Sequence, residues 1–156
     1  MKERTLVFLY NPKEKRILLA MKKRGFGEGK WNGVGGKIEE GETVEEAAVR
    51  EAHEEIGVLI APERLSHVAT IDFAFRDKPE FNQRVHVFFT DHWAGTPLES
   101  EEMRPKWFAV SRIPYKEMWI DDEHWLPRVL AGERVRASFT FGEGGETLLH
   151  KEVAVL

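Results

Sequence analysis

Three glutamates near the middle of the chain, Glu51, Glu54 and Glu55, have the residue type and the spacing to bind a divalent cation. Residues three and four positions apart share one face of a helix. On a helical wheel Glu51 and Glu55 lie in the middle of the apolar stripe formed by the alanines of this segment, and Glu54 lies beside them. Converging carboxylates repel one another, and they match the all-oxygen coordination of Mg²⁺. The pattern predicts a bound metal or a compensating cation such as Arg50.

A simpler interpretation is a solvated acidic helix, because runs of charge usually mark exposed faces. The place of the glutamates in the apolar stripe leaves the two interpretations about equally supported. The preceding segment, residues 25–41, favours the metal, since a glycine-rich loop that enters a helix suits a phosphate and its cation. Dinucleotide and P-loop motifs are excluded. The glycines at 25–29 open no helix, and Ile38 follows Gly36-Lys37 where a P-loop needs Ser or Thr.

The glutamates belong to a longer pattern that resembles the 23-residue box of the Nudix hydrolases, with Ala52 as the only soft departure. The pattern is Gly36-x5-Glu42-x7-Arg50-Glu51-Ala52-x-Glu54-Glu55-x-Gly57-Val58. The resemblance implies an α/β (α+β) Nudix fold, a mixed β-sheet sandwiched between helices. It also implies an enzyme that uses Mg²⁺, with Mn²⁺ as an alternative, to hydrolyse a nucleoside diphosphate linked to another group.

The resemblance also assigns roles to residues of the box and leaves the general base open. Glu51, Glu54 and Glu55 would bind the metal together with the backbone carbonyl of Gly36. Arg50 would orient a glutamate and is counted with the three glutamates as catalytic, while Glu42 would brace the start of the helix. Glu102 is a further metal ligand expected from outside the box, although an exposed acidic turn is the alternative interpretation of residues 99–102.

Other segments resemble the members of this family that hydrolyse oxidised purine nucleoside triphosphates in animals. The likeness runs from about Thr5 to Trp125 and is carried by segments 21–27, 30–33, 95–100, 102–105 and 118–122. It implies conversion of 8-oxo-dGTP, and of 2-hydroxy-dATP as a further substrate, to the monophosphate and pyrophosphate. The residues it assigns to the base pocket are Trp119 for stacking, Phe26 and Phe73 as walls, Asn32, Asp121 and Asp122 as hydrogen-bonding groups, and Thr5 and Lys22 nearby.

Two features of the predicted pocket bear on base preference. Adjacent Asp121 and Asp122 could share a proton, because one carboxylate raises the pKa of another, and could then act as donor or acceptor toward either oxidised base. The turn at 81–84 is longer than in the animal enzymes and places the polar Asn82 where an apolar residue is expected.

Other functions remain open at this point. The same chemistry could act on ADP-ribose, a dinucleoside polyphosphate or a methylated purine nucleotide. A non-catalytic nucleotide- or RNA-binding module on the same fold is disfavoured, because such a module is expected to have lost a metal ligand and all three box glutamates are present.

Hydrophobic periodicity and turn signals predict the elements that must hold these residues. The helix of the box spans 43–56, begins with the capping box Thr43-x-x-Glu46 and ends at Gly57. A second helix is expected over 121–130, with Asp121 or Asp122 as its cap. Strands are expected at 5–10 and 16–21 as a hairpin, at 66–75 and 83–93 as a second hairpin, at 103–110, and at 134–141 and 147–155 around a glycine turn.

Composition sets the outer limits. The length of 156 residues fits one domain, 1–156, and the formal net charge of −4 argues against a stable nucleic-acid partner. No cysteine is present, so thiolate metal sites and disulfides are excluded. No apolar run is long enough to cross a membrane, and no apolar signal segment follows Met1. We therefore expect a cytoplasmic monomer whose partner is a small nucleotide.

Overall fold

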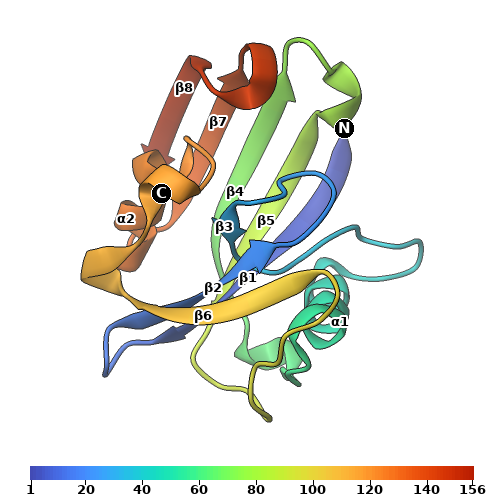
Figure 1. Cartoon of the computed structure of the whole chain (residues 1–156), viewed down its shortest axis with the longest axis vertical. Coiled ribbons are helices and arrows are strands. Elements are labelled where there is room, and N and C mark those ends of the chain that lie inside the picture. The colour runs from blue at the N-terminus through green and yellow to red at the C-terminus, as the bar shows by residue number, and fades with distance from the viewer.

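A computed structural model describes all 156 residues and contains one mixed sheet with two α-helices (Figure 1). The strands are β1 (Lys2–Asn11), β2 (Arg16–Lys22), β3 (Trp31–Asn32), β4 (Ser66–Phe75), β5 (Gln83–Thr90), β6 (Met103–Ala109), β7 (Val135–Phe141) and β8 (Leu148–Val155). The helices are α1 (Val44–Ile56) and α2 (Asp122–Leu130), and short 3-10 turns include η2 (Pro79–Phe81) and η5 (Glu143–Gly145). Neither helix is long and apolar enough to span a membrane.

The strands follow the order β3-β2-β1-β5-β4-β7-β8, and β6 pairs with β2. Parallel pairing of β1 with β5 and of β4 with β7, among antiparallel neighbours, makes the sheet mixed as expected. The β4–β5 and β7–β8 hairpins are confirmed, although β5 ends at Thr90 rather than at residue 93.

The predicted hairpin of β1 and β2 forms only at its tip, where Tyr10 and Asn11 pair with the start of β2. The glycine-rich segment lies against the rest of this edge of β1, with Val7 N donating to Val34 O at 2.6 Å and Thr5 N donating to Gly36 O at 2.9 Å. A β-carbon at Gly35 would overlap the carbonyl oxygen of Thr5, so this close approach requires glycine. The glycines therefore bring the start of the box onto the central sheet.

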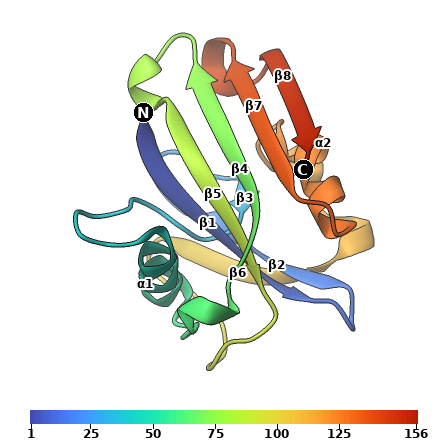
Figure 2. The same cartoon turned by 180° about the vertical axis from the view of Figure 1, so that it is seen from behind.

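Alternate residues of the central strands point into two separate cores. On β1, Phe8 packs into the core that holds Trp125 of α2, whereas Val7 and Leu9 pack into the core that holds Ala52 of α1. Each fully buried side chain of this size contributes about 1.5–3 kcal/mol. The helices cover opposite faces of the sheet (Figures 1 and 2), which confirms the predicted sandwich.

Helix α1 begins as predicted. The Thr43 hydroxyl accepts a hydrogen bond from Glu46 N at 3.1 Å, and the Glu46 carboxylate accepts one from Thr43 N at 2.9 Å. Gly57 ends the helix with a left-handed φ of 74°, and its N–H donates to His53 O. The start of the acidic helix is thereby fixed by local sequence.

Helix α2 lies where it was expected, but the prediction that an aspartate caps it is wrong. Asp121 occupies the N-cap position without a capping hydrogen bond from its side chain. Its carboxylate accepts instead from Trp125 Nε1 at 2.8 Å, one turn further along the helix. The aspartates at this helix start are therefore oriented by packing in the core and remain available to the cavity beside them.

Candidate active site

Helix α1 presents its glutamates to three different environments. Glu55 is buried with 6% of its surface exposed, the side chain of Glu51 is 16% exposed, and that of Glu54 is 56% exposed. The alanines at 47, 48 and 52 are fully buried around them. The wheel prediction is thus confirmed, because carboxylates do occupy the stripe that the helix turns inward.

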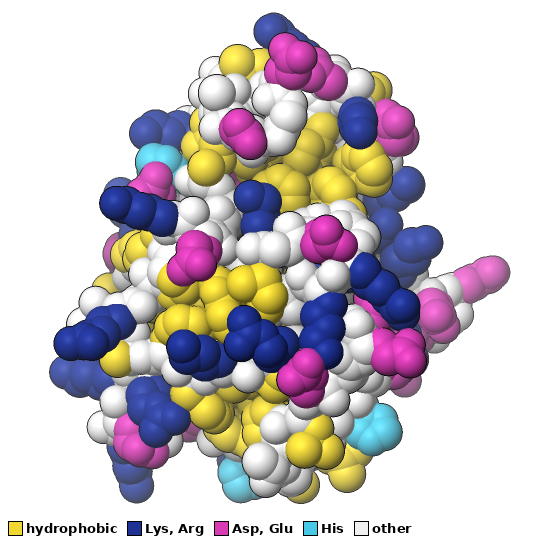
Figure 3. Space-filling view, in the orientation of Figure 1, with side chains coloured by type: hydrophobic (Ala, Val, Ile, Leu, Met, Phe, Trp, Pro, Cys, Tyr) yellow, Lys and Arg dark blue, Asp and Glu magenta, His cyan; other side chains and the backbone are white.

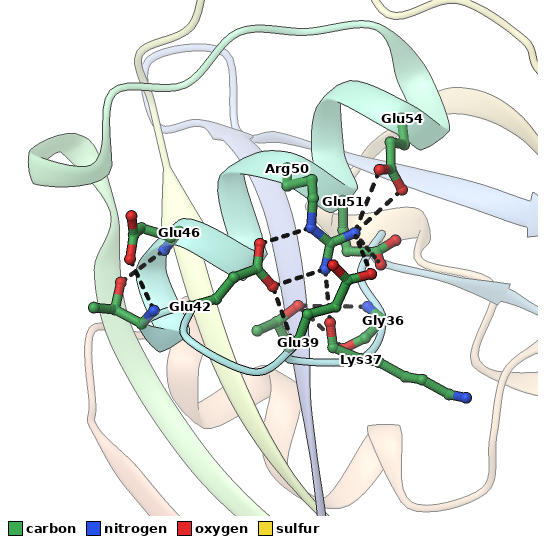
Figure 4. A network of polar contacts seen from close by, with 10 residues as sticks. Gly36, Lys37, Glu39, Glu42, Glu46, Arg50, Glu51 and Glu54 are labelled. Carbon is green, nitrogen blue, oxygen red and sulfur yellow. Dashed lines mark hydrogen bonds and ion pairs between the residues drawn. The ribbon is translucent and has the colours of Figure 1, made fainter.

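Arg50 supplies the expected compensating cation (Figure 4). Its guanidinium donates to both oxygens of Glu42 at 2.7 and 3.0 Å, to Glu51 at 2.9 Å and to Glu54 at 3.3 Å. It also donates to the backbone carbonyl of Lys37 at 2.9 Å. A planar fork with five donors is suited to this role, so Arg50 ties the loop before α1 to the acidic face of the helix.

Burial raises the pKa values of the two inner glutamates. The pKa of Glu55 rises to about 7 because burial disfavours its charge, although the N–H of Gly35, which donates to it at 2.7 Å, acts in the opposite direction. The pKa of Glu51 is raised by burial and partly restored by Arg50. A cation beside them would favour their charged forms, and the raised pKa values are a signature of such sites.

The residues present fit a divalent metal by donor chemistry and by space. Every candidate ligand is an oxygen, and a β-carbon at Gly36 would come within 2.7 Å of the Glu51 carboxylate, so only glycine leaves this approach open. In the present side-chain positions no three carboxylates or imidazoles converge on one point. Arg50 lies between the glutamates instead, so binding a metal would require the side chains to move.

Glu102 lies outside α1 and is held by cations. Arg24 donates to its Oε1 through Nε at 3.1 Å and Nη2 at 2.9 Å, and Lys22 Nζ lies 3.6 Å from its Oε2. These cations lower the pKa of Glu102, with the Arg24 hydrogen bond as the main cause. Its role as a metal ligand stays a prediction.

A pocket of about 400 Å³ opens beside this acidic region. It contains every residue predicted to contact the substrate, namely Thr5, Lys22, Phe26, Asn32, Phe73, Trp119, Asp121 and Asp122. Gly35 and Gly36 also line it, and these glycines contact Glu55 and Glu51 respectively. The two glycines therefore link the pocket to the acidic face of α1, whose glutamates do not themselves line the pocket.

Two adjacent carboxyl groups lie at the buried side of the pocket. Asp121 is 2% exposed and Asp122 is 3% exposed. Burial raises the pKa of both groups, and the charge of Asp121 raises the pKa of Asp122 further. Oδ2 of Asp122 is buried without a hydrogen-bond partner in the protein. This pair can hold a proton near neutral pH and offers an unsatisfied oxygen to a ligand in the pocket.

Aromatic rings close the pocket. Phe26 lies between Trp119, at a centroid distance of 5.1 Å, and Phe81, at 4.7 Å with a nearly parallel ring. Phe75 and Phe141 contact Trp119 edge-on. Phe75, Phe81 and Phe141 were not predicted as site residues, because they come from three segments that only the folded sheet brings together.

Asn82, expected near an apolar position of the pocket, lies next to the lining residue Phe81 and does not itself line the pocket. Its side-chain oxygen accepts a hydrogen bond from Phe75 N at 2.7 Å and so braces the turn between β4 and β5. The neighbouring Phe81 lines the pocket instead. The longer turn therefore adds an aromatic ring rather than a polar group.

Two further polar side chains face the pocket: Gln83, which was not predicted, and Lys30, which was expected near the phosphates rather than beside the base. Gln83 and Lys30 line the pocket, and Lys30 Nζ lies 5.2 Å from the centre of the Trp119 ring. A cation at this distance is attracted to the indole face. The run of basic residues between 22 and 30 was the available signal for Lys30.

Basic residues also continue onto the surface of β6. Figure 3 shows Lys and Arg side chains in a row across the face where β6 lies, beside a hydrophobic patch. On this strand Arg104 lies 5.1 Å from the Trp31 ring centre and Lys106 lies 5.2 Å from that of Phe108. Positive charge near the pocket favours the approach of an anionic ligand.

Comparisons with a family model, with curated proteins and with solved structures all point to the same family and fold. A NUDIX domain matches residues 2–129. The chain is 48% identical to the oxidized purine nucleoside triphosphate hydrolase of Mus musculus over 137 residues, which is 88% of this chain and 85% of the mouse protein. It is 45% identical to the protein of the same name from Danio rerio, over 94% of this chain and 91% of the fish protein. The crystal structure of a MutT protein from Bacillus halodurans shares the fold, with a TM-score of 0.84 at 22% identity over 98% of this chain and 97% of that one.

Proposed function

The chain belongs to the NUDIX family and is a Nudix hydrolase, and on that premise we propose that it converts oxidised purine nucleoside triphosphates to the monophosphate and pyrophosphate. One observation carries the proposal. A pocket is lined by aromatic rings and a buried pair of carboxyl groups, and two of its lining residues, Gly35 and Gly36, lie directly against Glu55 and Glu51 of α1. Such a site can hold a purine at one end and its phosphates at the other.

At the base end, Trp119 supplies a flat face on which the purine stacks, a contact worth about 1–3 kcal/mol. Asn32, Asp121 and Asp122 then bond to the edge of the base. Because the aspartate pair can hold a proton, it can donate to an acceptor of 8-oxoguanine or accept from a donor of 2-hydroxyadenine. Thr5, Lys22, Phe26 and Phe73 complete the walls.

At the phosphate end, Glu51, Glu54 and Glu55, the carbonyl of Gly36, and Glu102 are the groups that would hold Mg²⁺ or Mn²⁺. Gly36 O accepts a hydrogen bond from Thr5 N at 2.9 Å and a longer one from the Thr5 hydroxyl at 3.5 Å, so a cation would have to replace the hydroxyl as its second partner. The bound cation would neutralise phosphate charge and acidify the attacking water. Arg50 keeps Glu51 and Glu54 oriented, and the Gly35 N–H fixes the carboxylate of Glu55.

The reaction adds water across a phosphoanhydride. The water oxygen forms a bond to phosphorus while the bridging oxygen leaves with its electron pair, which yields a nucleoside monophosphate and pyrophosphate. Lys22 and Lys30 at the pocket, together with Lys23 and Arg24 of the adjoining loop, favour binding of the triphosphate. We further propose that the enzyme acts in the cytoplasm as a single-domain monomer without a stable nucleic-acid partner.

Measuring pyrophosphate release from 8-oxo-dGTP, 2-hydroxy-dATP, dGTP and ADP-ribose side by side tests the proposal. We expect the two oxidised purines to have the highest kcat/KM values, and Glu55→Gln to lose roughly a hundredfold or more in kcat, as when other electrostatic contacts of a transition state are removed. Preferential turnover of ADP-ribose would contradict the substrate assignment. Tight nucleotide binding without turnover of any substrate would indicate a binding module.

A further inference from the structure

Trp119 is contacted by two glycines that lie far apart in the chain. A β-carbon at Gly27 would lie 3.4 Å from Trp119 Nε1 and 3.8 Å from Cε2. A β-carbon at Gly145 would lie 3.3 Å from Cζ3, the ring atom para to Cε2. The backbone therefore approaches the indole at two opposite positions, once from the glycine-rich loop and once from the turn between β7 and β8.

Backbone conformation favours glycine at both positions, and the indole adds a second constraint that neighbouring glycines do not have. Gly27 and Gly145 have φ values of 87° and 69°, in the left-handed region that favours glycine. Their neighbours Gly25 and Gly144 have nearly the same φ values, 81° and 70°, yet a β-carbon there would meet nothing within 4 Å. What distinguishes Gly27 and Gly145 is the space that the indole occupies.

The turn that carries Gly145 is held in place by its own hydrogen bonds. Gly145 N donates to Gly142 O at 3.1 Å, and Gly142 N donates to Thr147 O at 2.9 Å. Phe141, the last residue of β7, also contacts the indole at a centroid distance of 5.5 Å. The end of β7 and the turn after it thus form one wall behind Trp119, and the loop with Gly27 forms the other.

We propose that Gly27 and Gly145 are positioning residues that seat the Trp119 indole and thereby set the affinity of the pocket for a purine base. The inference rests on the proposed function, because Trp119 is the surface on which the base stacks. It also assigns a role in base recognition to the C-terminal hairpin, a region that holds none of the predicted site residues. A methyl group at position 145 would displace the ring by a few tenths of an ångström, whereas one at position 27 would lie at the limit of ordinary van der Waals contact and disturb the ring less.

The chain offers a matched experiment, the comparison of Gly145→Ala with Gly144→Ala. Both substitutions place alanine at a left-handed φ and should lower the melting temperature by similar amounts. Only Gly145→Ala should raise the KM for 8-oxo-dGTP, by about three- to tenfold given the worth of a stacking contact, with little change in kcat. Gly27→Ala against Gly25→Ala should repeat the pattern with a smaller effect.

Combining Gly145→Ala with Trp119→Phe separates an effect on the position of the indole from a general loss of stability. In a Trp119→Phe variant the smaller ring lacks the atom that Gly145 faces, so adding Gly145→Ala should have no further effect on KM. Equal KM values for Gly144→Ala and Gly145→Ala, or the full Gly145 effect in the Trp119→Phe background, would overturn the inference.

The proposed function can fail independently of this inference. A wild-type protein that does not hydrolyse oxidised purines would contradict the function. Gly144→Ala and Gly145→Ala would then be compared through their dissociation constants for 8-oxo-dGTP and dGTP, measured by calorimetry. A loss of affinity confined to Gly145→Ala would still support the proposal that Gly145 positions the Trp119 indole.

Discussion

The two ends of the site hold their carboxyl groups in opposite ways. At the α1 end, Glu42, Glu51 and Glu54 surround one guanidinium, that of Arg50. At the base end, Asp121 and Asp122 are almost fully buried next to each other, no guanidinium lies between them, and Asp121 accepts the indole N–H of Trp125. A shared cation keeps carboxylates charged, whereas burial without a cation favours a retained proton. The first arrangement suits phosphates with a metal, and the second suits hydrogen bonds to a neutral base.

The largest expected effect tests the cation at the α1 end. Arg50→Lys keeps the charge but loses the fork that contacts Glu42, Glu51 and Glu54 together, so we expect kcat to fall about 10- to 100-fold, as for other groups that orient metal ligands. KM should change much less, because the base pocket is intact. Steady-state kinetics with 8-oxo-dGTP measure both constants. The exposed Glu45→Gln on the same helix is the control, and a kcat equal to that of this control would contradict the assignment.

The next effect tests the protonated pair at the base end. Asp121→Asn and Asp122→Asn each replace a carboxyl group, which can gain or lose a proton, by an amide whose N–H group is always a donor. The ratio of kcat/KM for 8-oxo-dGTP to that for 2-hydroxy-dATP should therefore change by about tenfold. The exposed Asp91→Asn should leave the ratio unchanged. If neither pocket variant alters the ratio, the pair does not read the base through a shared proton.

A smaller effect tests the aromatic closure over the base. Phe81→Ala removes the ring stacked on Phe26 at 4.7 Å, and aromatic pairs contribute about 0.5–1.5 kcal/mol. We expect KM to rise about two- to tenfold at nearly constant kcat. Glu80→Ala, an exposed neighbour in the same turn, serves as control. A drop in kcat without a change in KM would place Phe81 with the chemistry rather than with the base.

The smallest effect concerns stability against pH. Asp121, Asp122 and Glu55 have pKa values raised above their ordinary values. Between the ordinary and the raised pKa values, the folded state therefore binds more protons than the unfolded state. Their contribution to the free energy of unfolding is therefore fully present at low pH and is lost as pH rises through the raised values. Asp122→Asn removes one of these groups, so the loss of stability with rising pH should become smaller.

Urea unfolding at several pH values measures this slope. The part of the decline that remains in Asp122→Asn should be reduced further by adding Glu55→Gln, because Glu55 titrates in the same direction at the other end of the site, and Asp121 accounts for what is left. An unchanged slope in the double variant would show that neither end holds a proton in the folded state.

The α1 end could be predicted from the sequence because its parts are local. The capping box, the glutamate spacing, the candidate cation Arg50 and the terminating Gly57 all lie within 15 residues, and helix geometry alone sets their relative positions. The longest of these interactions, the hydrogen bonds of Arg50 to Glu42 and Lys37, reach only to the loop that precedes α1.

The base end was predicted residue by residue only through its resemblance to known enzymes. The hydrogen-bond partners of these residues could not be predicted from the sequence. Asp121 was expected to cap α2 but bonds to Trp125, since a buried indole N–H needs a partner. Asn82 was expected near an apolar position of the pocket, but the local pattern did not show that its side chain bonds to the backbone of β4 or that Phe81 beside it lines the pocket.

The sequence by itself thus determined the arrangement of the acidic face of α1, because its carboxylates, the arginine between them and the helix caps interact across a few residues. Tertiary structure decided how the base is enclosed. Phe26, Phe81, Trp119 and Gly145 come from four separate segments, and the parallel pairing of β4 with β7 brings the last turn of the chain to the pocket. Such contacts depend on strand order and register, which local patterns of polarity and turn residues leave open.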